Sequence, residues 1–182
     1  MQHVKIPQDR IGVLIGEGGE TLRLIEDRAD VRLNVDSENG SVAVDSVGDP
    51  LLSLKGPDIV KAIGRGFTPE EALRLLEGDM MMLDVIDIEA RSRNKNDLKR
   101  MKGRLIGEDG RTRELLEELT GASVVIYGTT LSAIGGPEQV ETVRRAVEML
   151  LDGAPHGAVY SFLEDRKRER DQGGLGYHPY QR

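Results

Sequence analysis

The stretch "GRLIGEDGRTRELLE" at residues 103–117 holds two glycines three positions apart, with two acidic residues between them. A second stretch, "GVLIGEGGETLRLIE" at residues 12–26, is identical to it at 9 of 15 positions, at an offset of 91 residues. Glycines at this spacing let a nucleic-acid backbone come close, because no Cβ is in the way. The repeat predicts two copies of one module, and it raises the question of why a phosphate-approaching loop would carry Glu108 and Asp109.

Composition limits the classes of protein to consider. The chain of 182 residues can hold one ordinary domain or two small ones, and with two Phe, four Tyr and no Trp its core is expected to be aliphatic. No apolar run approaches the roughly 18 residues of a membrane span, and the first ten residues do not resemble a signal peptide. The lack of Cys excludes disulfides and thiolate metal sites and favours the cytoplasm. Three scattered His residues do not indicate a metal cluster.

Charge is distributed unevenly along the chain. The net charge is −7, and residues 1–78, with 9 basic and 14 acidic side chains, contribute −5 of it. Residues 91–113 carry nine basic and three acidic side chains, a balance of +6. A local basic field on an acidic body is compatible with an anionic partner, because the distribution of charge matters more than its sum.

Hydrophobic periodicity and turn signals predict the same order of elements in both copies: strand, helix, loop, helix, strand, strand, helix. In the first copy we expect the strands and helices, leaving out the loop, at 3–7, 8–15, 20–28, 30–36, 41–45 and 50–64. In the second copy we expect them at 82–88, 94–106, 111–121, 122–127, 130–134 and from Pro137 onward.

A short connector separates the copies. In "FTPEEALRLLEGD", Thr68, Pro69 and Glu71 have the spacing of a helix N-cap, first-turn proline and capping box. The predicted domains are a first module at 1–66, the connector helix at 67–80, a second module at 81–153, and a C-terminal helix with a mobile tail at 154–182.

The position of the loop between two helices suggests its chemistry. The second helix begins directly after the glycines, so its unpaired N–H groups and positive dipole end face whatever lies on the loop. Bases would then lie in an aliphatic groove between these helices and the hairpin strand. Such a groove suits single-stranded RNA, whose unstacked bases are read by their edges.

Basic residues mark the second module as the stronger candidate for RNA contact. Three lysines share one stripe of the helix at 94–106, and arginines lie before and after them. The predicted RNA-binding residues are Lys95, Lys99, Lys102, Arg91, Arg93, Arg104, Arg111, Arg113, Gly107, Glu108, Asp109 and Gly110, with Gly16, Glu17, Gly18 and Gly19 in the first copy. A solvated charged face and a purely structural turn are the alternative interpretations, and the second is stronger for the acidic first copy.

"LIGEGG" and "LIGEDG", each in this order of elements, resemble the loops of KH domains of the type found in eukaryotes and archaea. The resemblance implies an α+β fold of two tandem type I KH modules, each a three-stranded sheet packed against three helices. Residues 95–165 more narrowly resemble the second KH module of the archaeal Partner-of-Nob (Dim-type) proteins of small-ribosomal-subunit assembly. Loops of that family more often carry proline or a neutral residue where this chain has Glu17, Glu108 and Asp109.

The family resemblance also implies partners. These are small-subunit ribosomal RNA near its 3′ end, the nuclease that trims this RNA, and the alpha subunit of the initiation factor that carries initiator tRNA. No cofactor, metal or membrane partner is expected. A protein–protein adaptor with degenerate KH folds, docking through its acidic first module, is the second hypothesis. An RNA-cleaving enzyme is the third and is disfavoured, because the sequence lacks metal-spaced acids, a Ser–His–Asp arrangement and a P-loop.

Three further segments carry smaller expectations. The methionine run 80–82 is expected to enter a strand and to pack between the modules. The "RKRER" segment 166–170, interleaved with acids, is expected to form a salt-bridged helix face. The tail, with Tyr177, His178 and Tyr180, is expected to be disordered.

Overall fold

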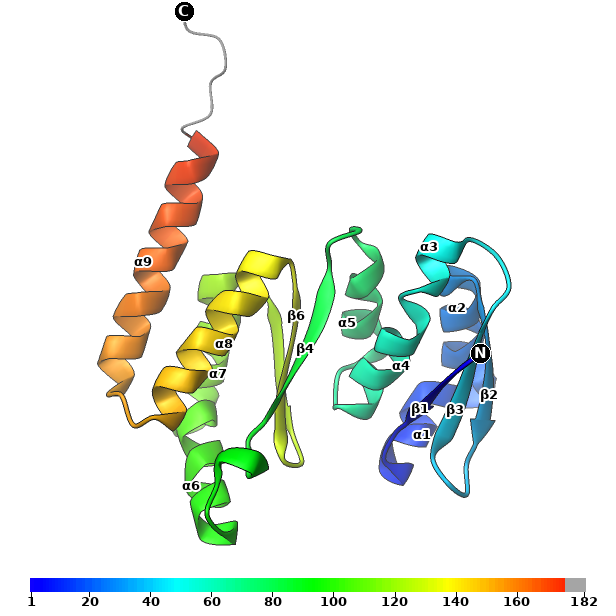
Figure 1. Ribbon diagram of the computed structural model, residues 1–182, viewed down its shortest axis with the longest axis horizontal. Helices are drawn as coiled ribbons and strands as arrows, with labels where there is room; N and C mark the ends of the chain where they lie inside the picture. Colours follow the sequence, from blue (N-terminus) through cyan, green and yellow to red (C-terminus); the bar gives the residue numbers. More distant parts are fainter. Residues whose placement is uncertain (176–182) are drawn as a thin grey trace, which may run out of the picture.

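The computed structural model describes residues 1–175 and consists of two α+β modules of the same topology (Figure 1). The first module comprises β1 (Gln2–Lys5), α1 (Gln8–Ile15), α2 (Glu20–Ala29), β2 (Val31–Asp36), β3 (Ser41–Ser46), α3 (Pro50–Ser53) and α4 (Gly56–Gly64). The connector α5 (Pro69–Leu73) follows. The second module comprises β4 (Met82–Asp87), α6 (Lys95–Ile106), α7 (Arg111–Thr120), β5 (Ser123–Tyr127), β6 (Thr130–Gly135) and α8 (Pro137–Leu151), and α9 (His156–Leu175) is appended to it. The predicted tail residues Tyr177, His178 and Tyr180 lie outside the described residues.

Each module contains one three-stranded antiparallel sheet in which the last strand is central. The orders are β1-β3-β2 and β4-β6-β5, with Val4 opposite Val42 in the first sheet and Ile86 opposite Leu131 in the second. Single 3₁₀ turns bridge the helix pairs at Glu17–Gly19 and Glu108–Gly110. The predicted fold class, two tandem α+β modules that each pack a three-stranded sheet against helices, is confirmed.

The helix predicted at 50–64 is in fact two helices. A proline lacks the N–H that an α-helix needs in its interior, and Pro57 therefore occupies the first turn of the new helix α4. The short α3 before it is capped by Asp49, whose side chain accepts a hydrogen bond from the Leu51 N–H at 2.8 Å. The connector carries the predicted capping box between Thr68 and Glu71.

The second sheet lies between helices on both faces, and this joins the modules. Every residue of β6 is buried, whereas β2 of the first sheet alternates between buried and exposed positions. The outer face of the second sheet is covered by α4, α5 and the turn after it, so that Ile134 is fully buried within the first module's core (Figure 1). Val125 and Leu83 pack against the same cluster.

Polar contacts reinforce this interface. Arg74 after α5 donates to Ser123 Oγ at 2.5 Å, and the Tyr127 hydroxyl donates to Asp9 of α1. The hydrogen bond to Asp9 raises the pKa of Tyr127, because the carboxylate favours the protonated phenol. The Arg10 guanidinium lies 5.5 Å from the centre of the Tyr127 ring, within the range of a cation–π contact.

The prediction that the methionine run 80–82 packs between the modules is confirmed only in part. Met81 packs against the inter-module core, but Met80 and Met82 are exposed to 70% and 40%.

Helix α9 is anchored at its start and along its length. Val159 and Leu163 are buried in the second core, and Arg170 donates to the carbonyls of Leu119 and Thr120 at the end of α7. The predicted salt-bridged face is confirmed by the pairs Arg166–Glu169 and Arg168–Asp165. Over residues 1–175, no helix has both the length and the apolar character needed to cross a bilayer.

We expect the change Ile134→Ala to lower the free energy of unfolding by about 2–5 kcal/mol, because a buried aliphatic side chain leaves a cavity when truncated. Chemical denaturation followed by circular dichroism should show one transition for both modules. Val47→Ala, at a position that is 60% exposed, is the control and should change little. Two separate transitions, with only one shifted, would contradict a shared core.

Candidate nucleic-acid interface

The first glycine of each loop is required by the turn itself. Gly107, with φ 78° and ψ 173°, is so close to the start of α7 that an added Cβ would lie 2.7 Å from the Thr112 backbone nitrogen. Gly16 has the same conformation, and a Cβ there would lie 2.9 Å from the Thr21 nitrogen. These backbone angles are essentially restricted to glycine. At these two positions the structural explanation is sufficient.

The second glycine is in a different environment. Gly110 has φ 75°, and an added Cβ would meet no atom within 4 Å. No side chain caps α7 at Gly110, although the Arg111 N–H already donates to the Glu108 carbonyl oxygen of the loop, and the positive dipole end of α7 lies behind the loop. A ligand backbone can therefore approach the GEDG loop (residues 107–110) at Gly110 rather than at Gly107.

The conformation of Asp109 explains one of the two acids. Asp109 has φ 52° and ψ 28°, and the corresponding residue of the first loop is Gly18, with φ 57°. Aspartate and asparagine are among the few residues with a side chain that adopt this left-handed conformation. The position therefore admits glycine or a short polar side chain.

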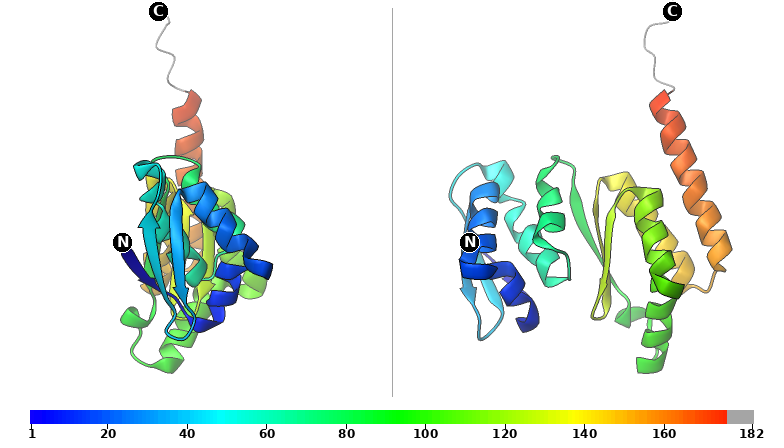
Figure 2. Two further views of the ribbon diagram at one scale, coloured as in Figure 1. Left: turned by 90° about the vertical axis from the view of Figure 1, so that its right-hand side faces the viewer. Right: turned by 180° about the vertical axis from the view of Figure 1, so that it is seen from behind.

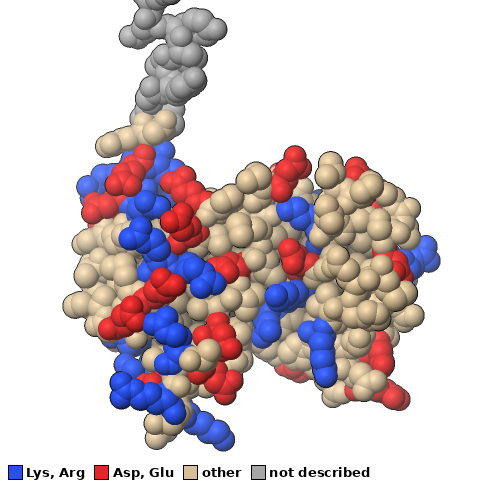
Figure 3. Space-filling view, in the orientation of Figure 1, with Lys and Arg blue, Asp and Glu red and all other residues tan. Residues whose placement is uncertain are grey.

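The three predicted lysines form a continuous lysine face on α6. Lys95, Lys99 and Lys102 line an open depression of about 400 Å³ together with Leu98, Gly103 and Ile106. Among the described residues, no carboxylate lies within 4.0 Å of these three ammonium groups. Ile106 is 37% exposed and gives the depression an aliphatic wall. Charge and apolar surface thus meet on one helix, and Figure 3 shows Lys and Arg gathered around this part of the molecule.

The predicted arginines are more occupied than the lysines. Arg91 pairs with Asp152 at 2.6 Å, Arg113 with Glu117 at 3.1 Å, and Arg111 with Glu114 at 3.8 Å. Arg104 donates to the carbonyl oxygens of Leu150 and Ala154, which satisfies the end of α8. Arg104 therefore stabilises the fold, and its contact with RNA stays a prediction. Arg93 is exposed near the start of α6.

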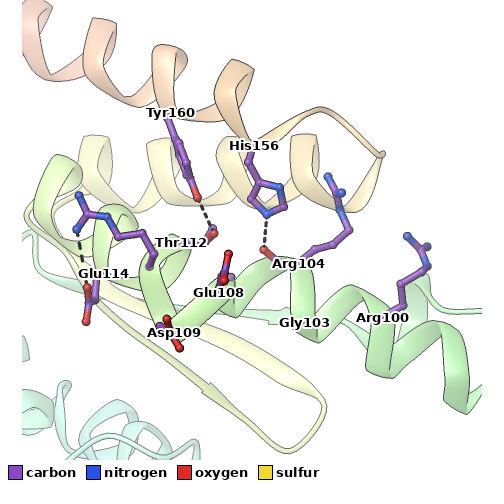
Figure 4. A pocket seen from close by; sticks show the side chains of 11 residues that line it. Arg100, Gly103, Arg104, Glu108, Asp109, Thr112, Glu114, His156 and Tyr160 are labelled. Atoms are coloured by element: carbon purple, nitrogen blue, oxygen red, sulfur yellow. Dashed lines mark hydrogen bonds and ion pairs between the residues drawn. The ribbon is translucent and has the colours of Figure 1, made fainter.

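Sequence reasoning did not find a second hollow, on the other side of the GEDG loop. This α9 cleft has a volume of about 820 Å³ and lies between the loop, α6, α7 and the start of α9 (Figure 4). Its walls include Arg100, His156 and Tyr160, none of which belonged to the predicted site. Tyr160 and His156 are far from the loop in sequence and follow a helical pattern, so no local signal connects them to it.

Arg100 is held in place from its own helix. It donates to Asp97 at 2.7 Å, and this bond is the main reason why the pKa of Asp97 lies below its usual value. The Arg93 N–H also donates to Asp97, and the Asn94 side chain caps α6 by accepting from the Asp97 N–H. The first turn of α6 is therefore well fixed.

The first module presents a similar loop without a similar cationic helix. On α1, Arg10 donates to the carbonyls of Ile63 and Phe67, both at 2.8 Å. Arg23 donates to the carbonyl oxygen of Gly18 within the loop. Glu17 is exposed. The GEGG loop (residues 16–19) therefore lacks a counterpart of the lysine face.

These features define a class of protein. An antiparallel three-stranded sheet with the last strand central, helices beside it, and a G-x-x-G turn between the first two helices together make up a type I KH domain, and this chain contains two.

The comparisons with known proteins agree with this class. A family model described as "Eukaryotic type KH-domain (KH-domain type I)" matches residues 82–168, and a KH domain model matches residues 1–65. A KH domain-containing protein of Methanocaldococcus jannaschii is 47% identical over 92% of this chain and 74% of its own length. The pre-rRNA-processing protein PNO1 of Debaryomyces hansenii is 32% identical over 64% of this chain, and the match spans about half of that relative, 47%.

Solved structures extend the likeness. Dim2p from Pyrococcus horikoshii matches with a TM-score of 0.84 and 47% identity, over 90% of this chain and 98% of its own. The structure of an a/eIF2alpha–aDim2p–rRNA complex from the same organism matches with a TM-score of 0.86 and 46% identity, over 92% of this chain and 94% of the matched one. The chain belongs to the Dim2/PNO1-type family of KH-domain proteins, RNA-binding factors of ribosome assembly.

We expect Gly107→Ala to lower the free energy of unfolding by about 1–3 kcal/mol, because the methyl group would meet the Thr112 backbone in a conformation that alanine avoids. Gly103→Ala is a matched control: Gly103 is inside α6, with no atom within 4 Å of the added Cβ. That change should be neutral or slightly stabilising. Equal losses in both variants, measured by thermal and chemical unfolding, would contradict the role of the first glycine.

Proposed function

We propose that this protein binds single-stranded RNA mainly through its second KH module, without catalysing a reaction on it. The observation that carries the proposal is the lysine face, where three ammonium groups border an aliphatic depression beside the GEDG loop and have no carboxylate partner within residues 1–175. Phosphates would contact these lysines and approach the loop at Gly110, in front of the positive dipole end of α7. Unstacked bases would lie against Leu98 and Ile106.

The shape of this surface favours a single strand over a duplex. The aliphatic wall is about one helix wide, and the bases of a duplex are stacked inside, out of its reach. Sequence-specific recognition of RNA mostly uses unpaired bases for this reason. In the part of the chain that the structure describes, no aromatic side chain lines the depression beside the lysine face, so bases would be held by aliphatic contact and by hydrogen bonds to their edges.

We further propose small-subunit ribosomal RNA near its 3′ end as the RNA, and the cytoplasm as the place of binding. The support comes from relatives named for pre-rRNA processing and from the structure titled as a complex with rRNA. The same complex supports the initiation-factor alpha subunit as a protein partner. The trimming nuclease is proposed from the family resemblance.

A second candidate function is protein docking by the first module. Its loop is acidic, its Arg10 is occupied, and Leu51 and Leu54 beside α3 are exposed to 70% and 67%. These two roles are compatible, because they use different modules.

Replacing Lys95, Lys99 and Lys102 together by Gln should weaken binding of all RNA sequences similarly. Each lysine that neutralises a phosphate contributes about 0.7 to the slope of log affinity against log salt for a single strand, so the slope should fall by up to about 2. Fluorescence anisotropy with labelled RNA at several salt concentrations measures this. A triple change of Lys5, Lys61 and Lys167 to Gln removes the same charge elsewhere and is the control. An equal loss of affinity in both triple variants would mean that the lysines act only through the net charge of the protein, and would contradict a binding site on the lysine face.

The two loops are best compared in the full chain, because the core shared through Ile134 makes separated modules a poor test. Gly110→Asp should reduce RNA affinity at least about tenfold, because it places a charge where the phosphate approaches. Gly19→Asp should have a small effect. Gly110→Asn adds the same backbone strain without the charge, and it therefore separates the effect of strain from the effect of charge on RNA affinity. If Gly110→Asp folds and binds normally, the RNA lies elsewhere and the docking function gains weight.

A further inference from the structure

The α9 cleft lies next to the lysine face, on the other side of α6. Gly103 lines both hollows, and Arg100 and Arg104 face the cleft as the lysines face the depression. A strand that lies along the lysine face and crosses the GEDG loop therefore enters the α9 cleft next. The cleft has room for a nucleotide, at about 820 Å³.

Helix α9 holds the walls of the cleft in place. The Tyr160 hydroxyl and the Thr112 hydroxyl share a hydrogen bond of 2.8 Å at the start of α7, and His156 Nε2 lies 3.0 Å from the carbonyl oxygen of Arg104 near the end of α6. Tyr160 is adjacent to Val159, which is fully buried. Both helices that flank the GEDG loop are thus tied to α9. Among the described residues, Thr21 of the first loop forms no comparable side-chain bond.

The side chains that line the cleft suit a nucleotide base. Figure 4 shows Glu108 directed toward the gap between Tyr160 and His156, and Asp109, which also lines the cleft, farther from that gap. Within the described residues, Glu108 has no cationic or hydrogen-bonding side-chain partner, so its carboxylate is a free acceptor. The Tyr160 ring offers a face on which a base can stack. Arg100, which is held by Asp97 at 2.7 Å and whose side chain is still 58% exposed, lies at the other end of the cleft, where a phosphate would follow.

A carboxylate distinguishes bases by their donors. Cytosine, adenine and guanine carry an exocyclic amino group that can donate to it, whereas uracil presents a carbonyl oxygen at the corresponding place. The same carboxylate repels phosphate, so it is favourable only where a base edge, and not the backbone, faces it.

We propose that the α9 cleft is a second nucleotide-binding subsite, which takes a base with an exocyclic amino group from the RNA strand that crosses the GEDG loop. Glu108 accepts a hydrogen bond from the amino group, Tyr160 stacks on the base, and Arg100 contacts the following phosphate. This subsite rests on the proposed RNA-binding function, and it extends the RNA-binding site beyond the KH groove.

The experiment measures full-chain affinity for oligo(rC) and oligo(rU) of four and eight nucleotides. Four nucleotides fill the groove, and eight also reach the cleft. The wild-type protein should bind rC8 about tenfold more tightly than rC4, with a smaller gain for oligo(rU), because one further base is stacked and read. The variant Glu108→Gln should reduce the ratio of rC8 to rU8 affinity severalfold. This ratio is insensitive to the lost charge, because both RNAs carry the same phosphates.

Matched variants separate this role from general effects. Asp109→Asn removes the neighbouring loop carboxylate, which does not lie at the gap between Tyr160 and His156, and should leave the rC8 to rU8 ratio unchanged. Arg100→Gln should reduce the gain from four to eight nucleotides, and Arg168→Gln on the exposed face of α9 should not. Tyr160→Leu should abolish most of that gain, and Tyr160→Phe, which keeps the ring, should retain it.

The outcomes are distinguishable from a failure of the proposed function itself. If rC4 and rC8 both fail to bind, the lysine-face proposal is wrong and the subsite falls with it. If rC4 binds but the length gain is unaffected by Tyr160→Leu, or Glu108→Gln and Asp109→Asn change the ratio equally, the subsite is overturned while the groove stands. Equal losses in Tyr160→Phe and Tyr160→Leu would mean that α9 only braces the loop.

Discussion

The second sheet is covered on both faces, and the rest of the arrangement depends on this burial. An antiparallel sheet commonly leaves one face to solvent, as the first sheet does here. In the second sheet, β6 has no exposed position, and Ile134 contributes to the core of the other module. Separating the modules would expose this apolar face to water. Their relative orientation is therefore fixed by packing, and the helix pairs α1–α2 and α6–α7 lie on the same side of the molecule (Figure 2).

The fixed orientation makes the difference between the two loops informative. Both loops have the same backbone conformation, because Gly16 and Gly107 meet the same steric demand from the threonine that follows. Their surroundings differ. Arg10 donates to carbonyl oxygens at and after the end of α4, whereas the three lysines of α6 have no carboxylate partner among residues 1–175. The identical residues in the two loops thus indicate a shared turn conformation. The charges on the adjacent helix determine what each loop can bind.

Much of this could be predicted from sequence, because it is local. Hydrophobic periodicity, the repeat and the cap signals located the elements, and the lysine spacing placed three charges on one face of α6. The break between α3 and α4 was also local, but the apolar run through Ile59 and Ile63 outweighed Pro57 in the prediction. The occupation of Arg104 could not be predicted, because its partners Leu150 and Ala154 are close only after folding. The cleft wall formed by His156 and Tyr160 could not be predicted for the same reason.

The acids of the GEDG loop have two different physical explanations, although they are neighbours in sequence. Asp109 occupies a left-handed backbone position, where a short polar side chain is one of the few alternatives to glycine, and it does not lie at the gap between Tyr160 and His156. Glu108 has no such conformational reason, and its carboxylate faces the gap that α9 creates. A KH module without α9 would leave this side of the loop open to solvent, and an acid there would only oppose phosphate. With α9 in place, the carboxylate is paired with an aromatic wall, and the same charge that repels a backbone becomes an acceptor for the edge of a base.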